Sequence, residues 1–109
     1  MINIIEFQYF DGCPNSDATL ENLQVIMESN LIRNSRLKIV EVPDAKSAEK
    51  LNFQGSPTIL YNGFDIYLLE EPDTFSYSCR LFSIDGKQTG ILSQEYILAQ
   101  IDKIENKLA

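Results

Sequence analysis

Residues 10–16 read FDGCPNS and separate an apolar opening segment from the first amphipathic one. Gly12 breaks the apolar run, and Pro14 suits the first position of a helix, where its missing N–H would have no helical acceptor. Cys13 therefore lies at a helix N-terminus, where unpartnered N–H groups and the helix dipole favour the reactive thiolate. This position predicts a nucleophile or redox centre. The alternative is a small buried side chain at a strand–helix junction.

The flanking segments predict a β-α-β unit. Residues 2–10 are β-prone and apolar on both faces, which is typical of a central strand. The residues after Pro14 predict a helix of roughly five turns. Residues 36–42 predict a second strand, which a right-handed crossover would make parallel to the first. The core-facing positions of the helix are Leu20, Leu23, Met27 and Leu31, with Ile26 beside them.

The next segments predict a short helix and a hairpin. Asp44 can cap a helix from Ala45 to about Asn52. A strand over residues 55–61 follows, and Asn-Gly at 62–63 is the strongest short hairpin signal, so residues 64–69 should return antiparallel.

The last third of the chain is less regular. Residues 70–92 are weakly patterned, with strand character over 77–84 and a turn signal at Asp85-Gly86. Ser93 can cap a final helix. Its core-facing positions are Ile97, Ile101, Ile104 and Leu108.

Composition limits the classes of function. With 109 residues, 44% of them hydrophobic, the chain (1–109) should form one domain whose core needs no cross-link. The net charge of −7, without a Lys/Arg cluster, argues against nucleic acid and anionic membranes as partners. The N-terminal residues do not resemble a signal peptide, and no run of about 18 apolar residues occurs, so we expect a soluble, cytoplasmic protein.

The absence of histidine removes Cys-His hydrolases, Ser-His triads and His-ligated metals. The two cysteines, Cys13 and Cys79, lie 66 positions apart and cannot form a four-cysteine metal site within one chain. We therefore expect no bound metal or cofactor in a single chain; a metal shared between the two chains of a dimer stays an open alternative without a supporting motif. The main chemistry left for Cys13 is thiol–disulfide exchange.

The predicted order β-α-β-α-β-β-α, with a cysteine at the first strand–helix junction, resembles the thioredoxin fold. Residues 13–16, CPNS, resemble the family's Cys-x-x-Cys or Cys-x-x-Ser active site. Residues 55–58, GSPT, resemble the loop whose proline is cis and faces that cysteine. The resemblance covers residues 1–69 and the last helix, and it leaves 70–92 as an extra segment.

A closer resemblance is to small bacterial thioredoxin-like proteins, some labelled alkylmercury lyase-like or selenoprotein-like. The shared features are the opening FDGCP, the GSPT loop and a later Ser-Cys-Arg, here residues 78–80.

The resemblance implies roles for three residues. Cys13 is the expected nucleophile, although the carboxylates of Asp11, Asp17 and Glu21 oppose a further negative charge there. Ser16 replaces the second cysteine of the motif and either donates a hydrogen bond to the thiolate or is a solvated helix-start serine. Cys79 either resolves a mixed disulfide, with Arg80 favouring its thiolate, or is a buried strand residue. A resolving role requires Cα atoms within roughly 7 Å of each other.

The same resemblance implies that Ser56, Pro57 and Thr58 bind substrate. The Ser56–Pro57 bond should be cis, which would leave backbone groups beside Cys13 free to pair with an extended substrate. The alternative is an ordinary edge-strand proline. Of the aromatic residues, Phe10 and Phe53 are nearest to the two loops.

These features together predict a thiol–disulfide oxidoreductase in which Cys13 is the nucleophile and Cys79 or an external thiol resolves the intermediate. The expected partner is a disulfide-bearing protein or a small thiol; glutathione is a candidate, although the acidic composition argues against a dedicated site. Two alternatives remain open. One is a non-catalytic binding module for a peptide or a soft metal ion held by Cys13 and Cys79, and the other is an interaction protein in which Cys13 is incidental.

Overall fold

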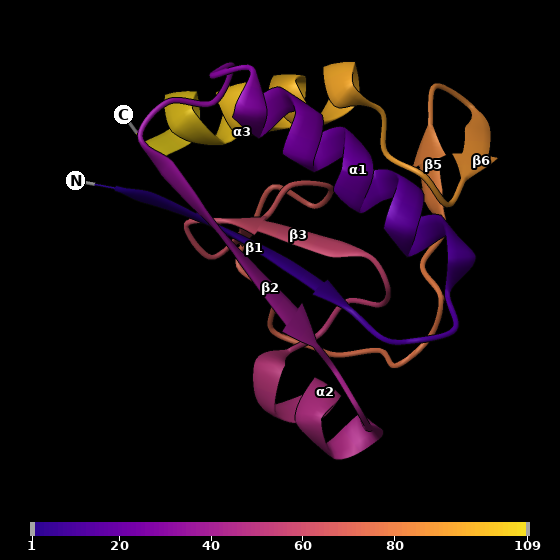
Figure 1. Cartoon of the computed structure of the whole chain (residues 1–109). Helices are drawn as coiled ribbons and strands as arrows, with labels where there is room; N and C mark the ends of the chain where they lie inside the picture. The colour runs from indigo at the N-terminus through magenta and orange to yellow at the C-terminus, as the bar shows by residue number, and fades with distance from the viewer. Residues whose placement is uncertain (1, 109) are drawn as a thin grey trace.

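The computed structural model describes residues 2–108, and the side chain of Leu108 lies outside this description. It contains a four-stranded mixed sheet in the order β2-β1-β3-β4 (Figure 1). β2 pairs parallel to β1, whereas β3 is antiparallel to both β1 and β4. The opening strand is thus central, as its two-sided apolar pattern predicts. The strands are β1 (Asn3–Tyr9), β2 (Ser35–Glu41), β3 (Thr58–Tyr61) and β4 (Phe64–Asp65).

Two long helices cover one face of this sheet. α1 (Pro14–Glu28) and α3 (Gln94–Leu108) lie next to each other on that face, while the short α2 (Ala45–Leu51) lies beyond one end of the sheet (Figure 1). The main core fills the space between the sheet and the two helices. Its fully buried members include Ile5, Phe7, Leu23, Ile26, Ile59, Tyr61, Ile97, Ile101 and Ile104.

A second, smaller cluster packs under α2. Val42, Ala48 and Phe53 are fully buried there, with Phe10 and Tyr77 packed against them. The Tyr77 hydroxyl donates to the backbone carbonyl of Val42 at 3.1 Å. This cluster joins the end of β2 to the extra segment that follows β4.

The predicted caps and the predicted hairpin are confirmed. The Asp44 carboxylate accepts the backbone N–H of Ser47 at 2.8 Å, and the Ser93 hydroxyl accepts that of Tyr96 at 3.1 Å. Asn62 and Gly63 have φ of 51° and 88°, as the tight turn between β3 and β4 requires.

The first helix is shorter than predicted. It ends at Glu28 because Asn30 adopts a left-handed conformation (φ 57°), which lets the Leu31 N–H reach the Ile26 carbonyl at 3.1 Å. Leu31, expected in the core, is 58% exposed.

The strand after the hairpin is also shorter than predicted. β4 contains two residues where six were expected, since Asp65 turns the chain. The Asp65 carbonyl accepts the Leu69 N–H, and its carboxylate accepts the Leu68 N–H, both at 2.8 Å.

The prediction of a strand over 77–84 is wrong for most of its length. Only β5 (Phe82–Ile84) is a strand, and it forms a hairpin with β6 (Lys87–Thr89) around Asp85-Gly86. Residues 77–81 do not join a strand because the backbone around Cys79 forms an isolated bridge to Ser56. In the part of the chain that the structure describes, no helix has the length and apolarity needed to cross a bilayer.

The end of α1 can be tested with two leucines. We expect Leu23→Ala, in the fully buried position, to lower the free energy of unfolding by about 2–5 kcal/mol, because it leaves a cavity. Leu31→Ala should change it by less than about 0.5 kcal/mol, because the side chain is exposed. Urea unfolding of both variants measures the difference, and an equal loss at the two positions would contradict the helix end at Glu28.

Candidate functional site

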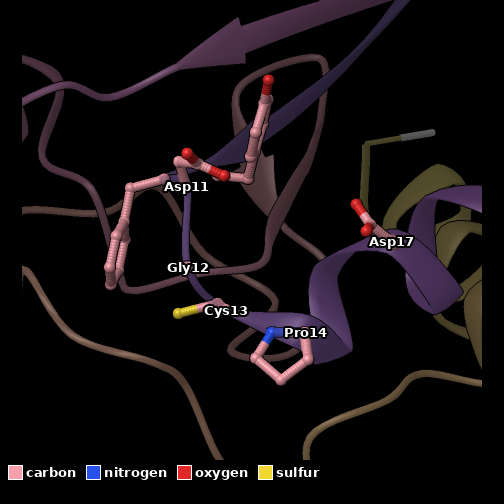
Figure 2. A pocket seen from close by; sticks show the side chains of 7 residues that line it. Asp11, Gly12, Cys13, Pro14 and Asp17 are labelled. Carbon is pink, nitrogen blue, oxygen red and sulfur yellow. The ribbon is translucent and has the colours of Figure 1, made fainter.

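Cys13 lies at the junction between β1 and α1. It is the N-cap residue of α1, with an extended backbone, and its carbonyl accepts the N–H of Ser16 at 3.1 Å. Gly12 makes the turn from the strand with φ of 103°, a region that L side chains rarely adopt. Figure 2 shows Cys13 between Gly12 and Pro14 at the start of the helix. The predicted placement of this cysteine at a helix N-terminus is confirmed.

Cys79 forms a disulfide with Cys13. The two Cα atoms are 5.9 Å apart although the residues are separated by 66 positions. The distance satisfies the requirement for a resolving cysteine. Cys13 is 6% exposed, whereas Cys79 is an exposed residue of the irregular segment after β4. The alternative of Cys79 as a buried strand residue is therefore wrong.

Of the two predicted roles of Ser16, the solvated helix-start serine is wrong, because Ser16 is 2% exposed. The hydrogen bond to a Cys13 thiolate stays a prediction, since Cys13 is in a disulfide here. The Ser16 hydroxyl lies 2.6 Å from the hydroxyl of Ser56, which is also buried. The Ser56 hydroxyl also accepts the backbone N–H of Phe10 at 3.2 Å. Ser16 and Ser56 therefore join the Cys13 loop to the loop that precedes β3.

The peptide bond between Ser56 and Pro57 is cis, as expected. However, the backbone groups of Ser56 are not free to pair with a substrate. Its N–H donates to the Ser78 carbonyl at 2.9 Å, and its carbonyl accepts the Arg80 N–H at 2.8 Å. The residues on either side of Cys79 thus occupy this edge. Thr58 is fully buried, and its hydroxyl donates to the Gly55 carbonyl at 2.6 Å within the same loop.

Arg80 does not have the role that was predicted for it. Its guanidinium makes two hydrogen bonds to the Asp65 carboxylate, at 2.9 and 2.8 Å, and the side chains of Arg80 and Asp65 are 9% and 0% exposed. Its charge is therefore balanced by Asp65 and is not directed at a Cys79 thiolate. Asp65 was missed from the sequence, where its only signal is a single carboxylate in the apolar run after the Asn-Gly turn.

A surface pocket of about 260 Å³ lies beside Cys13. Its lining contains two carboxylates, Asp11 and Asp17, and no basic residue (Figure 2). Burial raises the pKa of the Tyr9 phenol, and the negative charges of Glu41, Asp11 and Asp17 raise it further. The pocket is therefore acidic. It is lined by Tyr9, Phe10, Asp11, Gly12, Cys13, Pro14 and Asp17.

The positions of the aromatic residues and of the possible metal ligands restrict what the site can bind. Phe53 is fully buried, so of the two phenylalanines nearest the loops only Phe10 lines the pocket. Between residues 2 and 108, no group of three or more Cys, Asp or Glu side chains is arranged to hold a metal ion. What the site offers chemically is a disulfide at a helix start beside a small acidic pocket.

The disulfide should contribute measurably to stability. Because it closes a loop across 66 positions, its reduction should lower the free energy of unfolding by about 4 kcal/mol. Urea unfolding with and without a reducing agent measures this effect. Cys79→Ser provides the control, since its stability should match the reduced wild type and should not respond to the reductant.

Comparison with known proteins identifies no relative: no family model, curated protein or solved structure matches the chain.

Proposed function

We propose that this chain has a thioredoxin fold and acts as a thiol–disulfide oxidoreductase through Cys13 and Cys79. The observation that carries the proposal is the disulfide between these residues, one of which occupies the N-cap position of α1. A helix N-terminus stabilises the negative charge of a thiolate, and the second cysteine supplies the thiol that the Ser16 position lacks.

The thioredoxin assignment is supported by the arrangement of elements. A parallel β1-α1-β2 unit is followed by the antiparallel strands β3 and β4, and α1 and α3 share one face of the sheet. The cis bond before Pro57 lies in the loop that contacts the Cys13 loop through Ser56 and Ser16. The hairpin of β5 and β6 is an addition that follows β4 and precedes α3 in the sequence.

In the proposed reaction, the Cys13 thiolate attacks one sulfur of an external disulfide, which forms a mixed disulfide and releases one external thiolate. Cys79, as a thiolate, then attacks the Cys13 sulfur and releases the second external thiolate. The two cysteines lose two electrons in forming their disulfide, and the external disulfide gains them. Their two protons pass through solvent to the released thiolates. The reverse sequence reduces the protein disulfide with two external thiols.

The geometry favours a small thiol or disulfide as the partner over an extended peptide. Residues 78 and 80 already hold both backbone groups of Ser56, and the pocket beside Cys13 is small. Since Asp11 and Asp17 line this pocket, a neutral or cationic molecule fits it better than anionic glutathione.

The proposed roles of the two cysteines predict different mutant phenotypes. Cys13→Ser should lose about 100-fold or more of the exchange rate with hydroxyethyl disulfide, because no thiolate remains at the helix start. Cys79→Ser should instead accumulate a mixed disulfide at Cys13, which mass spectrometry of the intact protein detects. Exchange at the wild-type rate in Cys13→Ser would contradict the proposal.

The acidic pocket predicts a charge preference. Asp17→Asn should speed exchange with glutathione disulfide by about two- to fivefold at low salt and slow exchange with cystamine, because one negative charge is removed near the reacting sulfur. Both effects should vanish near 1 M salt. Glu21→Gln is the matched control, since it removes a charge from the same helix outside the pocket lining. Equal effects from the two variants would argue against a local role for the pocket.

A further inference from the structure

The segment Ser78-Cys79-Arg80 is held in place by contacts that do not involve sulfur. The residues before and after Cys79 bond to the two backbone groups of Ser56, at 2.9 and 2.8 Å. Gly55 allows this close approach, because a Cβ there would lie 3.1 Å from both the Ser78 carbonyl oxygen and the Arg80 Cβ. These backbone contacts can persist when the disulfide is reduced.

The Arg80 side chain fixes the same segment to the sheet. Its guanidinium is bidentate on Asp65, the last residue of β4, in a site where both side chains are largely withdrawn from solvent. The guanidinium carbon also lies 5.3 Å from the ring centre of Tyr67 and 4.9 Å from that of Phe82. A buried charge pair of this kind is costly to separate, because each partner would be left desolvated and unpaired.

We propose that Arg80 is a positioning residue that holds the Cys79 thiol within reach of Cys13 in the reduced protein. The effective concentration of one thiol at the other, and hence the equilibrium between dithiol and disulfide, then depends on the pair of Arg80 and Asp65. This inference rests on the proposed function for its biological use, although the equilibrium itself needs no enzymatic turnover. With glutathione as the redox couple, the reduced protein and one glutathione disulfide give the protein disulfide and two glutathione molecules.

The test is the equilibrium constant of this reaction in glutathione buffers, read from the fraction of protein that resists alkylation by a maleimide. Arg80→Met, which keeps the length of the side chain without its charge, should lower the constant about tenfold and raise the reduction potential by about 30 mV. Arg80→Lys should give an intermediate shift, because it restores the charge without the bidentate geometry. Lys38→Met is the control, since it removes a surface ion pair with Glu6 (3.8 Å) and should leave the constant unchanged.

If Arg80 has only a structural role, Arg80→Met lowers the free energy of unfolding of the oxidised and reduced forms equally. The equilibrium constant then stays at the wild-type value, which would overturn the proposal. If Arg80→Met does not fold, the same measurement on Arg80→Lys decides, because a constant within twofold of the wild type in a folded variant contradicts the positioning role. Exchange at the wild-type rate in Cys13→Ser, or no mixed disulfide in Cys79→Ser, would overturn the proposed function and leave this equilibrium result standing.

Discussion

Three separate segments of the chain meet at the hydrogen bonds of Ser56. Its hydroxyl accepts the Phe10 N–H and lies against the hydroxyl of Ser16, while its N–H and carbonyl bond to residues 78 and 80. The end of β1, the start of α1 and the extra segment after β4 are thereby fixed to one buried residue. The two cysteines lie on two of these segments, so their approach depends on Ser56 as much as on the sulfur–sulfur bond.

The core and the site are separate in this chain. The large cluster between the sheet and the two long helices contains neither the cysteines nor the two serines. The site is built instead where loops meet at one end of the sheet, beside the smaller cluster of Val42, Ala48 and Phe53. Its geometry therefore depends on polar contacts between loops, and a well-packed core alone would not produce it.

Local signals in the sequence predicted much of the fold. The break at Gly12-Cys13-Pro14, the cap at Asp44 and the turn at Asn62-Gly63 each act within a few residues, and each appears where expected. The end of α1 was placed too late, because the left-handed conformation of Asn30 competes with a continuing apolar stripe. The short length of β4 was also missed, since it depends on hydrogen bonds of the Asp65 carboxylate and carbonyl. No sequence motif predicts these bonds.

The site was predictable only in part for the same reason. Cys13 could be placed from its neighbours, but the positions of Cys79 and Arg80 depend on partners far away in the sequence, at Ser56 and Asp65. The buried pairing of Ser16 with Ser56 likewise joins residues 40 positions apart. Periodicity and turn chemistry report short-range preferences, so contacts of this kind lie beyond them.

The covalent link between Cys13 and Cys79 also has a mechanical consequence. A force applied through β1 and α3 would reach the disulfide before it could extend α1, β2, α2, β3 or β4, all of which lie within the closed loop. The 66 residue steps of this loop correspond to roughly 220–240 Å of extended chain. Under tension, the extended length of the oxidised molecule would therefore be smaller than that of the reduced one by about this amount. A two-electron change at one site thus sets how far the chain can be extended.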